Sequence, residues 1–153
     1  MDAVYVTRNT VFAATVGAKT VLKLITPTTF NIKVHEIGVS MDGVTSSAVP
    51  ATFEWGTSDE TTAGTGSGTA VTTQVKGRAQ AHGLTVGQNF SAEGTTYTIH
   101  NSIFVPQFMG VLVLQNPLGL EPESPGDAAD SFLLRINVTA NVNVLAWIKW
   151  SRA

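Results

Sequence analysis

Three histidines are the side chains of this sequence that could bind a metal ion or transfer protons: His35, His82 and His100. Glu36 follows His35, but no second histidine lies four residues further on, so the helical zinc-protease pattern is absent. His35 and His100 could meet across a sheet and bind a metal together with a carboxylate, although no ligand spacing in the sequence requires it. We therefore expect ordinary surface or hydrogen-bonded histidines and no metal site.

Acidic side chains gather in a proline-rich stretch near the end of the chain, at Glu121, Glu123, Asp127 and Asp130. They could form a weak calcium site, but their spacing is not that of an EF-hand loop. A solvated loop is the expected structure. Glu54 lies on the polar face of a predicted strand without a second carboxylate at a suitable spacing, so the paired-carboxylate chemistry of glycosidases has no support.

The stretch AGTGSGTA, residues 63–70, has the glycine content of a phosphate-binding loop. A P-loop ends in Gly-Lys-Ser/Thr and opens a helix, and neither feature is present. Ser67 is not in a nucleophile elbow, because Thr65 occupies a position that needs glycine. The sequence has no cysteine, which removes thiolate zinc sites and a cysteine nucleophile. We expect no catalytic residues and no cofactor, and hence a protein that is not an enzyme.

The composition narrows the classes of partner. Charged residues are 13% of the 153, against about 25% in an average domain, and the formal net charge is −2. The Lys and Arg residues are scattered, so a nucleic acid is not an expected partner. No apolar stretch reaches the length of a membrane helix, and the first residues do not have the pattern of a secretory signal. We therefore expect a protein that is made and assembled in the cytoplasm without contact to a membrane.

Strands must position these residues, because apolar side chains alternate with polar ones along most of the sequence. The pattern puts Ala51, Phe53 and Trp55 on one face of a strand. Around His35 and Glu36 the alternation shifts by one residue, which a β-bulge would produce. Runs of Gly, Pro, Ser, Thr, Asn and Asp separate the strands, and no long stretch has helical spacing.

About eight to ten short strands of this kind predict an all-β fold, an antiparallel β-sandwich similar to a jelly roll. We expect one domain over residues 1–153. Within it, residues 1–10 could form an N-terminal arm, and residues 57–73 and 116–130 are expected to be long surface loops.

The closing segment NVNVLAWIKW, residues 141–150, predicts a strand with two apolar faces. One face carries Val144, Ile148 and Trp150 and fits a sandwich core. The other face carries Leu145 and Trp147 and is only half polar. Such a strand is either central in the fold and covered by the chain's own loops, or covered by another subunit.

Four segments of the sequence resemble small virion proteins of tailed bacteriophages, the minor capsid or head decoration (cement) proteins. They are YVTRNTVFAATVGAKTVLKLITPT, KVHEIGVSMDGVTSSAVPATFEW, FVPQFMGVLVLQNPLGLE and FLLRINVTANVNVLAWIKW. The shared features are a V-x-R-N-T start, a DG-x-x-x-x-A-V-P turn into a strand, a PLG loop and an R-(I/V)-x-V-T-A strand before a strand that ends in Trp. These motifs cover most of the chain, and residues 58–92 match least well.

The resemblance implies a jelly-roll-like sandwich on the outer face of an icosahedral shell, often a homotrimer, with the major capsid protein lattice and other copies of itself as partners. It also implies a location on the capsid surface of a virion assembled in the bacterial cytoplasm. Such a protein needs no catalytic residues, because its binding to the assembled lattice is enough to oppose rupture of the shell. Subunit or capsid contacts are expected at the two ends of the chain, namely at Val4, Tyr5, Arg8, Leu145, Trp147 and Trp150.

Two other functions remain open from the sequence. The first is a carbohydrate-binding or receptor-binding jelly-roll module, in which Trp55, Tyr97 or Trp147 would stack on sugar rings. The second is another role in the virion for the same fold, such as a head fibre, a tail-associated protein or a neck component. The alternation turns Trp55 inward, which favours core packing over a sugar platform.

Overall fold

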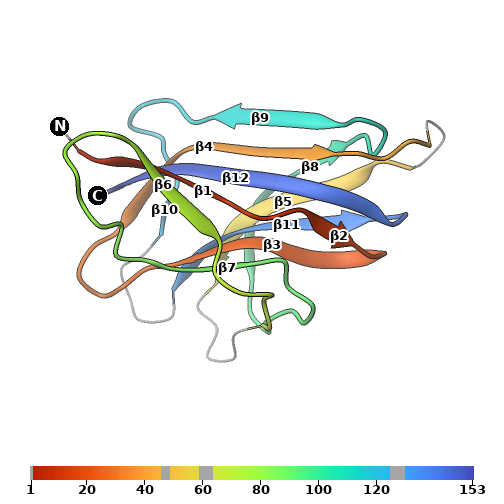
Figure 1. Cartoon of the computed structure of the whole chain (residues 1–153), viewed down its shortest axis with the longest axis horizontal. Coiled ribbons are helices and arrows are strands. Elements are labelled where there is room, and N and C mark those ends of the chain that lie inside the picture. Colours follow the sequence, from red (N-terminus) through yellow and green to blue (C-terminus); the bar gives the residue numbers. More distant parts are fainter. Residues whose placement is uncertain (1, 46–48, 59–63, 125–129) are drawn as a thin grey trace.

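Strands account for all regular secondary structure that the computed structural model describes, which covers residues 2–45, 49–58, 64–124 and 130–153 (Figure 1). Within these residues there are twelve strands: β1 (Val4–Arg8), β2 (Phe12–Ala14), β3 (Gly17–Ile25), β4 (Ile32–Met41), β5 (Ala51–Ser58), β6 (Val71–Lys76), β7 (Thr85–Gln88), β8 (Thr98–Val105), β9 (Val111–Gln115), β10 (Glu123–Ser124), β11 (Ser131–Val138) and β12 (Val142–Arg152). This part of the chain contains no helix that could cross a membrane.

The strands form two antiparallel sheets. One has seven strands in the order β10-β4-β12-β1-β6, with β2 also paired to β12 and β9 also paired to β4. The other has five strands in the order β7-β3-β11-β5-β8. The two sheets pack face to face as a sandwich, so the predicted all-β class is confirmed.

The strand order is that of a jelly roll. β1 and β2 occupy one place, because both pair with β12. When β6, β7 and β10 are set aside, four places remain in each sheet, in the orders β1/β2-β12-β4-β9 and β3-β11-β5-β8. These are the two interleaved four-stranded sheets of the double Greek key. The described residues hold more than the predicted eight to ten strands because the β5–β8 connection adds β6 and β7, and the β9–β11 connection adds β10.

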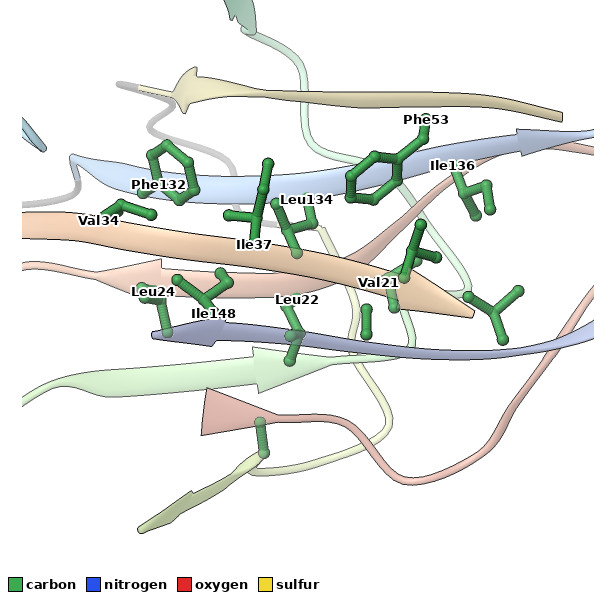
Figure 2. Close-up of a cluster of buried hydrophobic side chains, with 14 of the residues drawn as sticks. Val21, Leu22, Leu24, Val34, Ile37, Phe53, Phe132, Leu134, Ile136 and Ile148 are labelled. Carbon is green, nitrogen blue, oxygen red and sulfur yellow. The ribbon is translucent and has the colours of Figure 1, made fainter. Parts of the chain in front are cut away.

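The core lies between the two sheets and is built from the inward side chains of the alternating strands (Figure 2). Phe132, Leu134 and Ile136 of β11 point inward, as the alternation predicts. Ile148 of β12 and Phe53 of β5 are also fully buried there. Burial of side chains of this size stabilises the fold by about 1.5–3 kcal/mol each before conformational entropy is counted.

The predicted β-bulge near the start of β4 is confirmed. Lys149 of β12 pairs with Glu36, and the next residue, Trp150, pairs with Val34. His35 is therefore the extra residue on β4, and the strand keeps an apolar face toward the core on both sides of it.

The N-terminal segment is not an arm. Residues 4–8 form β1, which lies between β12 and β6 and pairs with both (Figure 1). A strand with two neighbours has its backbone hydrogen bonds satisfied within the sheet, which is why the expectation for residues 1–10 was wrong.

The two predicted surface loops are each partly ordered as strand. The first, 57–73, overlaps the end of β5 and the start of β6, and residues 59–63 of it lie outside the described part. The second, 116–130, contains β10, which pairs with the beginning of β4. Residues 125–129 of that loop, including Asp127, also lie outside the described part.

Candidate interaction surface

The outer face of the seven-stranded sheet carries most of the residues that the sequence singled out for contacts. The register places Val113 of β9, Gly38 of β4, Trp147 of β12 and Arg8 of β1 in one row across four neighbouring strands. The next row holds Val111, Ser40 and Leu145 in the same order of strands. We call the side chains of these two rows the outer-sheet surface.

Trp147 is fixed within this surface rather than free to move. Its indole six-membered ring covers Gly38, where an added Cβ would collide with Trp147 Cζ2. The indole Nε1–H donates a hydrogen bond to Glu36 Oε1 over 2.9 Å. A side chain held at both its ring and its polar end has lost its rotamer freedom before it meets a partner, which lowers the entropic cost of binding.

Glu36 lies on β4 beside the outer-sheet surface, in the row of Lys149 and Gln115, and is only 9% exposed. Besides the indole of Trp147, its carboxylate accepts hydrogen bonds from Gln115 Nε2 over 3.0 Å and from Lys149 Nζ over 3.2 Å. Burial works against the charged form, but the hydrogen bonds from Gln115, Trp147 and Lys149 outweigh it and lower the pKa of Glu36 below its ordinary value. The carboxylate therefore stays charged and ties β4, β9 and β12 together.

Four of the six predicted contact residues lie on the outer side of this sheet: Val4, Arg8, Leu145 and Trp147. The other two are wrong as contact residues. Tyr5 and Trp150 point into the core and are 1% and 0% exposed. Their neighbours Val4 and Lys149 lie on the other side of the sheet, because successive residues of a strand face opposite sides.

The exposed large apolar side chains are concentrated along β8, β9 and the segments that follow them, and they include Val111 and Val113 of the outer-sheet surface. Among the described residues, eight of the fifteen large apolar side chains that are exposed fall between positions 99 and 120. We call these eight the apolar flank: Ile99, Phe104, Phe108, Met109, Val111, Val113, Leu118 and Leu120. Exposed apolar side chains of this size are candidate contact residues where they adjoin one another, as Val111 and Val113 do on β9.

Sequence reasoning missed the apolar flank, although a signal for it exists. Between Glu93 and Glu121 the sequence has no Asp, Glu, Lys or Arg. Apolar residues in that stretch lie on both sides of the alternation, as in VLVLQ of β9. A strand of this type is expected to be central in a sheet, whereas β9 lies at an edge.

The histidines do not form a metal site together. His35 Nε2 lies 2.8 Å from Ser151 Oγ in the seven-stranded sheet, and its Nδ1 lies 3.8 Å from Glu121. His100 lies in the other sheet, 3.3 Å from Thr57 Oγ1. Within the described ranges, no three His, Asp or Glu side chains gather in a way that could hold a metal ion.

A groove of about 850 Å³ is lined by residues near both ends of the chain. Its charged lining is mixed: Asp2, Lys33, His35, Arg78, Glu121 and Arg152. Lys33 pairs with Glu123 over 3.7 Å, and Arg152 lies over the ring of Phe30. Because the charges largely compensate one another, the groove does not favour a ligand of either sign.

A second polar cluster lies on the outer face of the five-stranded sheet. Glu93, in the loop between β7 and β8, accepts hydrogen bonds from the backbone and the hydroxyl of Thr20 and, over 3.0 Å, from Tyr97. Arg135 lies 3.8 Å from Glu93 and 4.7 Å from the Tyr97 ring centre. Burial, followed by the hydrogen bond to Glu93, raises the pKa of Tyr97. This cluster holds the loop between β7 and β8 against the sheet.

No protein-family model matches the chain, and no curated protein matches it. The solved structures to which it is similar include VP2 capsid protein of infectious bursal disease virus. A mutant VP2 in derived T=1 particles has 12% identity and a TM-score of 0.23, covering 97% of this chain and 39% of that one. The T13 particle of the same virus gives the same identity and TM-score, over 98% of this chain and 39% of the other. The chain thus spans about two fifths of these VP2 chains, and a likeness at this level carries no argument about function.

Proposed function

We propose that this protein is a non-enzymatic structural protein of a virion, which binds the outside of a bacteriophage capsid as a homotrimer and stabilises the shell. The observation that carries the proposal is the apolar flank, because an uncovered set of large apolar side chains favours a protein that works by binding another surface. The jelly-roll strand order supports it by analogy, since this fold is common in viral capsid proteins as well as in lectins.

Stabilisation by such a protein is a matter of linked equilibria. A protein that binds the assembled lattice and not loose capsid subunits adds its binding free energy to the lattice. Many copies on one shell multiply a modest energy per contact. The outer-sheet surface, with Trp147 held rigidly by Gly38 and Glu36, is suited to the contacts between copies.

The experiment that tests this proposal is co-sedimentation with undecorated shells of the phage that encodes the chain. We expect the wild-type protein to pellet with the shells and to raise the temperature at which they rupture. Changing Phe104 and Met109 together to Ser should weaken binding by about tenfold or more, as expected for interface anchors. The matched control is Val16→Ser, which removes a similarly exposed valine outside the apolar flank (63% against 72% for Met109). A wild-type protein that does not pellet, or a double variant that pellets as well as the control, would contradict the proposal.

A carbohydrate-binding function is a second candidate, and the position of Trp147 favours it. Of the three aromatic residues considered for a sugar platform, Trp55 packs against the core beside Phe53, and Tyr97 lies against Arg135. Trp147 lies on the outer face beside hydrogen-bonding groups of Glu36 and Lys149. A change in tryptophan fluorescence on addition of glycans, abolished in Trp147→Leu, would support this function over capsid binding.

A further inference from the structure

β9 has one free edge. It pairs with β4 on one side, and no strand in the described part of the chain pairs with it on the other (Figure 1). The direction of its backbone groups follows from the hydrogen bonds at its two ends. Met41 N–H donates to Gly110 C=O over 2.9 Å, and Asn116 N–H donates to His35 C=O over 2.8 Å.

In an antiparallel pair, the residues whose backbone groups point to the partner alternate with those whose groups point away. Gly110 and Asn116 point to β4, so the even-numbered residues of this segment do so too. Val111, Val113 and Gln115 therefore direct their N–H and C=O groups to the free edge. That edge presents three donors and three acceptors for which the described residues contain no pairing strand.

Three other edge strands, β6, β7 and β8, are protected in ways that β9 is not. β7 is covered by residues 67–70, since Ser67 N–H donates to Gln88 C=O over 2.9 Å. β6 carries Lys76, and Gln74 Nε2 donates hydrogen bonds to the C=O of Lys76 and to that of Arg78 beyond the strand. β8 is interrupted by a register shift opposite Gly56. β9 has no charge, no proline and no bulge, and natural edge strands that lack all three are prone to pair with another chain.

We propose that β9 of one copy pairs antiparallel with β9 of a second copy about a two-fold axis at Val113. This register sets Val113 opposite Val113 and Val111 opposite Gln115, and each of these pairs exchanges two backbone hydrogen bonds. All the outward donors and acceptors of both strands are then satisfied, and the two seven-stranded sheets join into one. A second copy is the partner that fits, because the strand is complementary to itself in this register and adds no uncompensated charge.

The pairing does not depend on the proposed capsid function. A two-fold contact cannot close a ring of three, so in a trimeric decoration protein it would join subunits of neighbouring trimers. The side chains of Phe104 and Met109 take no part in the backbone pairing and stay available for a capsid.

Because the sequence has no cysteine, a single introduced cysteine reports the pairing directly. The proposed register places the two Cα atoms of residue 113 about 5.5 Å apart, within the range of a disulfide. Under mild oxidation, Val113→Cys should form covalent dimers about tenfold faster than the control Val75→Cys, because pairing raises the local thiol concentration. Val75 is a suitable control because it is a valine of similar exposure on β6 (54% against 48%).

Light scattering of the wild-type chain gives a second, independent readout. We expect the mass to double as the concentration increases, from one copy to two, or from three copies to six where the chain is a trimer. Val113→Pro, which deletes an outward N–H without touching the bonds to β4, should keep the lower mass while its circular dichroism stays that of the wild type. Equal cross-linking rates for the two cysteine variants would overturn the proposal. So would a wild-type mass that does not rise with concentration, or a doubling of the mass that Val113→Pro leaves intact. Failure to bind capsids would leave this result unaffected, so the two proposals are tested separately.

Discussion

Tyr5 and Trp150 stack on each other inside the sandwich, with ring centres 4.6 Å apart and planes 26° from parallel. They come from the first and last strands, and β1 and β12 pair directly through these two residues. The indole Nε1–H of Trp150 also donates to Thr7 Oγ1 over 3.0 Å. This stack buries the tryptophan-bearing segment of β12 within the sandwich, where β12 lies between β1 and β4.

Trp150→Ala is expected to lower the free energy of unfolding by about 3–5 kcal/mol, because it leaves a large cavity and removes the partner of Tyr5. Chemical denaturation followed by circular dichroism measures this. Leu145→Ala, on the outer face of the same strand, should change stability by only about 0.5 kcal/mol. Equal effects of the two changes would show that β12 is not oriented as described.

Gly38→Ala is expected to displace Trp147, because the added methyl group occupies the space of the indole ring. The predicted loss is about 1–3 kcal/mol, as for other overpacked sites. The tryptophan emission maximum should shift as the ring leaves the surface and loses its bond to Glu36. The control is Ser40→Ala, two residues along the same face of β4, for which neither change is expected.

Glu36→Gln is expected to lower stability at neutral pH by about 1–3 kcal/mol, since it removes the charge that three donors share. The pKa of Glu36 is lowered in the folded protein from its ordinary value of 4.5, so its contribution is complete above pH 4.5 and is lost as the pH falls through the folded value. The stability difference between wild type and variant should therefore shrink below pH 4.5. The pKa of Asp42 is lowered as well, by hydrogen bonds from Asn143, but this carboxyl is present in both proteins and cancels in the difference. A difference that stays constant down to about pH 2 would contradict this.

Glu93→Gln is expected to lower the pKa of Tyr97 toward its ordinary value, because the carboxylate contributes to raising it, after burial. Ultraviolet titration in a Tyr5→Phe background isolates Tyr97, since the sequence has two tyrosines. The same change should speed amide hydrogen exchange in the loop between β7 and β8, which Glu93 ties to Thr20. An unchanged titration curve would mean that Glu93 does not contact the phenol.

The features that could be predicted from the sequence are those that follow from the alternation of apolar and polar residues within a single strand. In β12, Val144 and Ile148 face the core, and Leu145 and Trp147 face outward. The sequence predicts this because successive side chains of a strand point to opposite sides of the sheet. The bulge at His35 could be predicted for the same reason, since a strand whose alternation shifts by one residue keeps its apolar face on the core only by holding one extra residue.

Sequence reasoning failed where the outcome depends on which strands become neighbours. Ile99 and Ile103 are four residues apart and would share a face of a regular strand, but the register shift opposite Gly56 turns Ile99 outward. The local sequence does not distinguish an apolar strand at the edge of a sheet, such as β9, from one in the middle. It also does not show whether an N-terminal segment pairs with a sheet, as β1 does, or remains a free arm.

By itself, then, the sequence determined the all-β class, the core-facing side of regular strands such as β11 and β12, and the bulge in β4, because these follow from local alternation and turn chemistry. Only the tertiary structure decided three relationships. Tyr5 stacks on Trp150, and Glu36 accepts hydrogen bonds from Gln115, Trp147 and Lys149. The third is the unpaired edge of β9 among the described strands. These relationships join residues far apart along the chain, and the pairing of strands that creates them is settled by the packing of the whole sandwich.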